Sequence, residues 1–133
     1  MDKITKSFFV FITSIVLSAC VSQNYEKDAP VVENTASQNE MAMTRISLGL
    51  GYLKMGNTTQ AKLNLEKAKK FAPQLVQVHT AFAHYYDVVG EPELATNAYE
   101  EALSIDGSDP DTLNNYGVFL CRHEKYQAAE KYT

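Results

Sequence analysis

The side chains of this 133-residue chain that could do chemistry are its three histidines and two cysteines, and their spacing forms no catalytic or metal site. His79 and His84 are five residues apart, so they would point in different directions on one helix, and no HExxH motif or Cys/His cluster supplies further ligands. Cys121 could be a nucleophile beside His123, but residues i and i+2 of a helix do not face one another, so we expect a buried structural thiol. With neither a phosphate loop nor a GxSxG motif, we predict no enzymatic activity, no cofactor, no metal and no small-molecule substrate.

The other cysteine, Cys20, offers a different chemistry because of the residues before it. Two lysines and a short, largely apolar run at 8–17 precede the sequence Leu17-Ser18-Ala19-Cys20. That run is too short to span a bilayer, and its arrangement is typical of an export signal. The four residues resemble the bacterial lipobox, in which the cysteine becomes the acylated first residue of the mature protein. We therefore predict a signal peptide at 1–19 and lipidation of Cys20, the alternative being an ordinary secretory signal with an incidental cysteine.

Lipidation would make the chain a peripheral membrane protein, because two or three acyl chains bind a bilayer firmly where one binds only marginally. Val21 stands where an Asp retains proteobacterial lipoproteins at the inner membrane, so the lipobox resemblance implies the periplasmic face of the outer membrane. The whole chain has 12 basic and 16 acidic residues, a formal charge of −4. This acidic balance argues against nucleic-acid binding and against adhesion to anionic lipid by charge alone.

Beyond Cys20 the composition changes twice. Residues 20–40 are polar and lack any helical or alternating apolar pattern, which predicts a flexible tether. Residues 41–133 align with themselves at an offset of 34 residues, which is the signature of a helical repeat array. The small residues and alanines in register are Gly49, Ala83 and Gly117, and then Ala61, Ala95 and Ala129.

This pattern resembles the tetratricopeptide repeat, in which a W-x2-L-G-x2-Y helix is followed by an A-x3-F helix. The first unit has Leu48-Gly49-x2-Tyr52, and we expect Leu48 and Tyr52 to form a buried apolar stripe while Gly49 allows close helix packing. His79 holds the tryptophan position of the second unit, which predicts a packing residue. We predict an all-α solenoid of helical hairpins with repeats at 42–75, 76–109 and 110–133, and helices near 42–55, 59–71, 76–89, 93–105, 110–122 and 126–133.

The third unit stops inside its second helix, at Thr133, whereas a full repeat would continue to about 141. Solenoid ends normally carry a polar-faced cap. We therefore expect that this chain is a C-terminally truncated part of a longer repeat protein, the alternative being a natural short protein with a frayed end.

In tetratricopeptide repeats the first helix of each unit lines a concave, protein-binding side. Carried over by that resemblance, the candidate groove residues are Met43, Ile46, Leu50, Leu53, His84 and Val118, and the same mapping also includes Gln77, Thr80, Asp87, Asp111, Asn114 and Cys121. The four candidates of the first unit are all large and apolar. They suggest either a partner-binding surface or a surface that the tether or a preceding helix covers, and the sequence leaves both open.

Lipobox, tether and repeats together resemble the type IV pilus biogenesis and stability lipoprotein family, of the PilF and PilW type. The run Thr112–Cys121, TLNNYGVFLC, carries this resemblance most specifically. It implies a pilotin: an outer-membrane lipoprotein that binds the pilus secretin subunit and promotes its localisation and multimer assembly. Two alternatives remain. One is another repeat-containing outer-membrane lipoprotein, a scaffold for β-barrel or peptidoglycan assembly, and the other is an enzyme whose active site lies in a missing C-terminal part.

Overall fold

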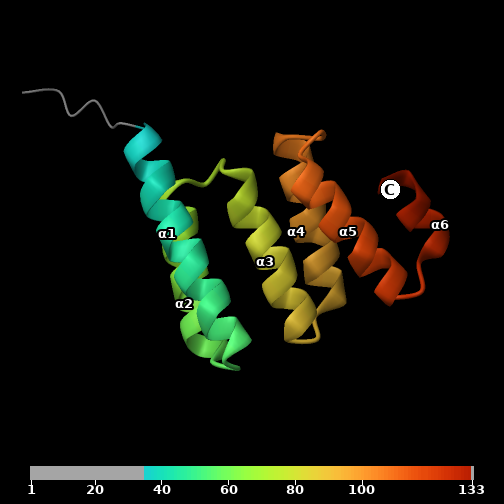
Figure 1. Cartoon of the computed structure of the whole chain (residues 1–133), viewed down its shortest axis with the longest axis horizontal. Coiled ribbons are helices and arrows are strands. Elements are labelled where there is room, and N and C mark those ends of the chain that lie inside the picture. The colour runs from blue at the N-terminus through green and yellow to red at the C-terminus, as the bar shows by residue number, and fades with distance from the viewer. Residues whose placement is uncertain (1–34, 133) are drawn as a thin grey trace, which may run out of the picture. The chain divides into compact units, whose positions relative to one another are not determined.

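The computed structural model describes residues 35–132, and this part of the chain is helical throughout, with no strand (Figure 1). The helices are α1 (Thr35–Lys54), α2 (Thr58–Phe71), α3 (Val76–Val88), α4 (Pro92–Ile105), α5 (Pro110–Arg122) and α6 (Tyr126–Ala129), with a 3₁₀ turn at Glu130–Tyr132. The all-α class and the helical-hairpin architecture predicted from the 34-residue period are confirmed. The expected signal peptide and Cys20 lie outside the described residues.

Consecutive helices pair as three hairpins, α1 with α2, α3 with α4 and α5 with α6 (Figure 1). The hairpins then stack through their first helices, since α1 packs on α3 and α3 packs on α5. Each hairpin also contacts the next through its second helix, α2 against α3 and α4 against α5. The first helices therefore lie next to one another, and together they form one side of the array.

Local sequence explains where the helices begin. Asn57 caps α2 by accepting a hydrogen bond from Gln60 N at 3.1 Å, and Asp109 caps α5 by accepting from Thr112 N at 2.8 Å. Proline occupies the first helical position of α4 and of α5, where its missing N–H leaves no helical hydrogen bond unmade. These caps agree with the boundaries that the sequence predicts for α2, α4 and α5.

The turn inside each hairpin repeats one backbone geometry. Its central residue has a positive φ, 77° at Gly56, 81° at Gly90 and 59° at Glu124, and these positions are spaced by the repeat period. In each case the next residue's N–H bonds the carbonyl five residues back, at 2.8–2.9 Å, as in a Schellman motif. The third hairpin thus adopts with a glutamate the left-handed conformation that the other two adopt with glycine.

Small residues set the helix spacing inside the first hairpin. A Cβ added at Gly49 would lie 2.9 Å from Leu65 Cδ2 and 3.2 Å from the Ala61 carbonyl oxygen, so only a glycine fits against α2. Ala61 and Leu65 are themselves fully buried. Farther along the array, aromatic rings fill the core, with Tyr116 stacked on Tyr99 at a centroid distance of 4.8 Å and Tyr132 against Tyr116 at 4.7 Å.

Three expectations are corrected by the structure. Helix α1 begins at Thr35, so the expected tether boundary at residue 40 is wrong; Ala42 is completely buried, and α1 continues for two further turns ahead of it.

Leu48 is 46% exposed, although its repeat counterparts Phe82 and Tyr116 are buried. Phe82 and Tyr116 are covered by the second helix of the preceding hairpin, and no described helix precedes α1. The last helix is also shorter than the expected 126–133, because its final turn tightens to a 3₁₀ helix.

Candidate protein-binding groove

A groove of about 420 Å³ runs across the first helices of all three hairpins, with one further contribution from α4. Its lining residues are Met43, Ile46, Leu50, Gln77, Thr80, Ala81, His84, Tyr99, Asp109, Asp111, Asn115, Val118 and Arg122. Five of the six residues proposed from the sequence line it together. The sixth, Leu53, does not line the groove and is 5% exposed in the hydrophobic core. Ile46, which is 6% exposed, belongs to the same core but does reach the groove.

Corresponding residues of the three repeats lie at the same level of the groove, so the polarity of its walls can be compared level by level. One level carries Met43 on α1, Gln77 on α3 and Asp111 on α5, each 34 residues from the next. A second level carries Leu50, His84 and Val118. The α1 wall is therefore apolar, whereas the α5 wall combines a valine with acidic groups.

A relay of hydroxyl groups holds α5 against α3 at the groove. Thr112, which is completely buried, donates its hydroxyl proton to Asp109 Oδ2 at 2.6 Å. Thr112 has already given its one proton to Asp109, so the Thr80 hydroxyl, 2.7 Å from Thr112 Oγ1, is the donor in the bond between the two threonines. The Val76 carbonyl oxygen, 3.2 Å from Thr80 Oγ1, competes for the same Thr80 proton. The N-terminus of α5, with its two aspartates, is thereby fixed in place beside α3.

A buried carboxylate outside the groove lining pairs with Arg122, which does line the groove. Asp87, whose side chain is 5% exposed, pairs with Arg122 Nη1 at 2.8 Å and with His123 Nε2 at 2.9 Å. Asp87 therefore offers no free carboxylate to a ligand, contrary to its place in the sequence-based mapping. Burial raises the pKa of the neighbouring Tyr99 to about 12, and the negative charge of Asp87 contributes to the rise.

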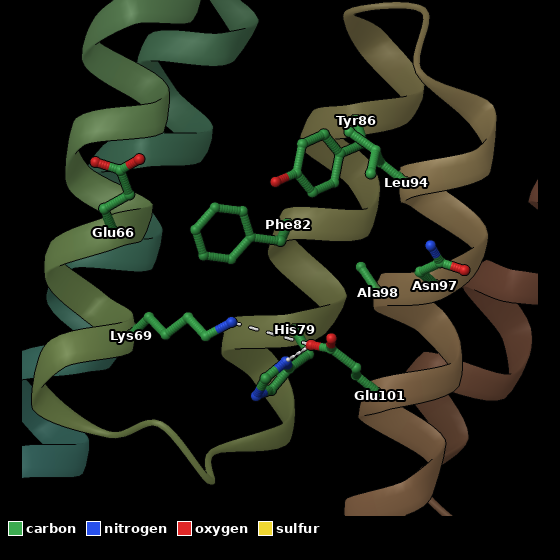
Figure 2. A pocket seen from close by; sticks show the side chains of 9 residues that line it. All are labelled: Glu66, Lys69, His79, Phe82, Tyr86, Leu94, Asn97, Ala98 and Glu101. Atoms are coloured by element: carbon green, nitrogen blue, oxygen red, sulfur yellow. Dashed lines mark hydrogen bonds and ion pairs between the residues drawn. The ribbon is translucent and has the colours of Figure 1, made fainter.

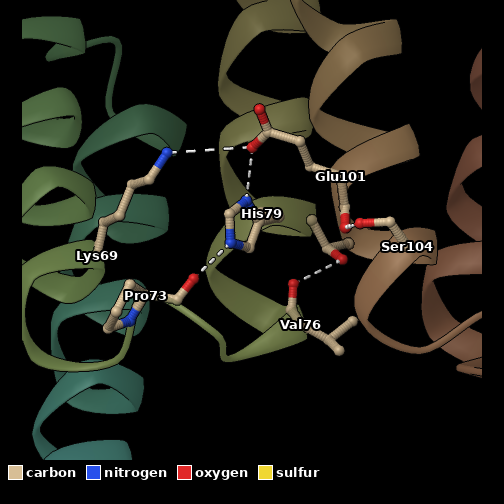
Figure 3. A network of polar contacts seen from close by, with 7 residues as sticks. Lys69, Pro73, Val76, His79, Glu101 and Ser104 are labelled. Carbon is tan, nitrogen blue, oxygen red and sulfur yellow. Dashed lines mark hydrogen bonds and ion pairs between the residues drawn. The ribbon is translucent and has the colours of Figure 1, made fainter.

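A second hollow, of about 370 Å³, lies between α2, α3 and α4 and is lined in part by Phe82, Tyr86 and Leu94 (Figure 2). In the same lining His79 bonds Glu101 Oε2 at 2.9 Å and, outside it, the Pro73 carbonyl at 2.8 Å, and Lys69 Nζ lies 4.0 Å from the same glutamate oxygen (Figure 3). His79 is buried, as the sequence predicts. Its hydrogen bonds to a second helix and to the α2–α3 connection were not predictable from the repeat pattern.

Cys121 is exposed, so the expected buried thiol is wrong. It lines a third hollow together with Asn114, Val118 and Tyr132. The neighbouring His123, which caps the C-terminus of α5, is bonded through Nε2 to Asp87 Oδ1 at 2.9 Å. Within residues 35–132 no group of His, Cys, Asp or Glu could hold a metal ion, and no helix there is long and apolar enough to cross a membrane.

Comparison with known proteins agrees with this architecture. Residues 98–131 match the tetratricopeptide repeat. A Haemophilus influenzae protein described as uncharacterized is 34% identical over 131 residues, covering 98% of this chain and 69% of that protein. The type IV pilus assembly protein PilF of Pseudomonas aeruginosa is 36% identical over 124 residues, covering 93% of this chain and 48% of PilF. This chain thus spans about half the length of PilF.

A solved structure from the functional characterization of Pseudomonas aeruginosa pilF superposes with a TM-score of 0.68 at 40% identity, over 72% of this chain and 43% of that one. Stacked helical hairpins with an open groove on their first helices define a protein-interaction scaffold. The chain belongs to the tetratricopeptide-repeat family, and it is homologous to the type IV pilus assembly protein PilF.

Proposed function

We propose that this chain is an outer-membrane lipoprotein that binds the secretin subunit of the type IV pilus and promotes its localisation and multimer assembly. Cys20 carries the acyl chains that anchor the protein on the periplasmic face. The groove of the first helices receives a segment of the secretin. Homology to a type IV pilus assembly protein supports the pilus role, and the lipobox-like residues before Cys20 support the anchor.

The observation that carries the binding part of this proposal is the apolar α1 wall of the groove. Met43 is 45% exposed there and Leu50 is partly exposed, whereas Ile46 lines the groove but is only 6% exposed. Exposed apolar side chains gathered in a concave surface are typical of sites that bind protein segments. The polar groups on α3 and α5 would then orient the segment.

The test is an immunoblot for SDS-resistant secretin multimers in outer membranes of cells with and without the gene. We expect the deletion strain to lose multimers and keep the secretin monomer. Complementation with Met43→Glu should fail to restore the multimers, because the substitution places a charge in the apolar wall without disturbing the core.

Met41→Glu is the matched control, since Met41 lies on the same helix with 41% exposure and does not line the groove. This variant should complement as well as the wild type. Undiminished multimers in the deletion strain would contradict the pilotin role. Full complementation by Met43→Glu would instead contradict the groove as the binding site while leaving the role intact.

A further inference from the structure

The groove lining has an excess of negative charge when charged groups that already form internal ion pairs are left out. Arg122 is neutralised by Asp87, and Asp109 and Asp111 remain at the N-terminus of α5. Oδ2 of Asp109 is occupied by the backbone and the hydroxyl of Thr112. Asp111 is exposed and makes no hydrogen bond or ion pair with any residue of the described 35–132 segment. The groove therefore has an uncommitted negative charge on the wall opposite its apolar side.

We propose that the groove selects a segment that places an apolar side chain on the α1 wall and a lysine or arginine beside Asp111. This inference rests on the proposed function and adds to it the chemistry of the bound segment. Met43 on α1 and Asp111 on α5 lie at the same level of the groove. A segment that crosses the groove at this level would therefore contact an apolar side chain at one wall and a carboxylate at the other. The Thr80–Thr112–Asp109 relay holds that carboxylate wall in place before binding.

The helix spacing sets the expected distance between the two anchors. Neighbouring packed helices lie about 8–10 Å apart, so α1 and α5 are separated by about 16–20 Å. An extended chain advances about 3.3 Å per residue. The basic residue should therefore lie about five or six residues from the apolar one.

The test presents the full chain, purified from membranes in detergent, to a phage library of random 16-residue peptides. Three baits are compared: the wild type, Asp111→Asn, and Glu93→Gln. Glu93 is the matched control because it is an exposed acid in the first turn of α4 and does not line the groove. We expect the wild type and Glu93→Gln to enrich peptides with an apolar residue and a Lys or Arg at that spacing. The Asp111→Asn bait should keep the apolar preference and lose the basic one.

An enriched peptide and its Lys→Gln form then give the size of the effect. At low salt the wild type should bind the Gln form about two- to fivefold more weakly, as for an exposed ion pair, and the difference should shrink at about 500 mM NaCl. Asp111→Asn should bind both forms equally.

An apolar consensus without a basic residue, or a basic preference that survives Asp111→Asn, would overturn this inference and leave the proposed function standing. Failure of all baits to enrich any peptide would overturn it together with the groove as a binding site. If the basic preference is found but secretin multimers form without the gene, the proposed function alone fails.

Discussion

Asp87 Oδ2 lies 2.8 Å from Arg122 Nη1, an ion pair that joins the C-terminal ends of α3 and α5. The two partners are unequal, because the Asp87 side chain is 5% exposed and that of Arg122 is 57% exposed. The buried carboxylate depends on its partners, whereas the arginine can be solvated without it. Removing Arg122 should therefore change the stability of the fold differently from removing Asp87.

We predict that Arg122→Ala lowers the free energy of unfolding by about 1–3 kcal/mol, because it leaves Asp87 buried with only His123 beside it. Asp87→Asn in that background should recover part of the loss, since it removes the buried charge. Urea unfolding of the two single variants and the double variant measures the coupling. Simple additivity of the two changes would contradict the ion-pair interpretation.

The two glycines of α1 allow a direct test of helix packing. Gly49→Ala should destabilise the fold by about 1–3 kcal/mol, because the new methyl group would meet Leu65 and the Ala61 carbonyl. Gly51→Ala should stabilise it by about 0.5–1 kcal/mol, because a Cβ there meets nothing within 4 Å and alanine favours the helix. Thermal unfolding compares them, and similar shifts for both would contradict the close α1–α2 approach.

The third hairpin turn predicts an easy gain in stability. Glu124 has a φ of 59°, and an L-residue in that region is disfavoured by about 1–2 kcal/mol. Glu124→Gly should therefore raise the melting temperature, and Gly90→Ala, at the corresponding turn with φ 81°, should lower it. A destabilising Glu124→Gly change would show that the side chain contributes more than its backbone strain removes.

Alkaline pH should weaken the fold through its buried tyrosines. Burial raises the pKa of both Tyr99 and Tyr116 from 10.0 to about 12. Between these values the unfolded chain releases protons that the folded chain keeps, so their contribution is complete below about pH 10 and is lost toward pH 12. Absorbance at 295 nm should show a component titrating near pH 12. That component should shrink in Tyr99→Phe and in Tyr116→Phe, and its persistence in both variants would refute the assignment.

The anchor can be tested separately from the groove. Cys20→Ala should abolish acylation and move the protein from the membrane to the periplasmic fraction, because the acyl chains on Cys20 are the proposed membrane anchor. Immunoblots of fractionated cells, with labelling by a palmitate analogue, measure both effects. Unchanged membrane fractionation without label would contradict the anchor at Cys20.

Much of the fold could be predicted because it depends on local and periodic signals. Only a glycine at position 49 leaves room for α2, and Asp109 caps α5 just before Pro110. Both features can be recognised from the residue types and their spacing in the sequence. The exposure of Leu48 could not be predicted from its type, because it depends on whether another helix covers that face of α1. The repeat period gives the position of a residue within its own repeat. Which residues pack against it depends on whether another repeat lies on that side.

The repeat mapping places most of the lining residues on the first helices, but it does not give the polar contacts between them. Leu50, His84 and Val118 come together because a 34-residue spacing returns the chain to the same level of the next first helix, and Met43, Gln77 and Asp111 form a second level for the same reason. The pairing of Asp87 with Arg122 crosses between two hairpins, and no sequence pattern reports it. Leu53 was misplaced because the repeat mapping gives a helix face without the depth of each side chain.

The methionine in the α1 wall has a consequence for the range of ligands. A methionine side chain is unbranched and has three rotatable bonds, so it can reshape itself around apolar groups of different form. Met43 is free to do so because nearly half of its surface is exposed. Under the proposed binding role, Met43 would tolerate drift among valine, leucine and phenylalanine in the bound segment. Sequence change in the partner would then be accommodated at α1, while the proposed pairing with Asp111 would retain selectivity.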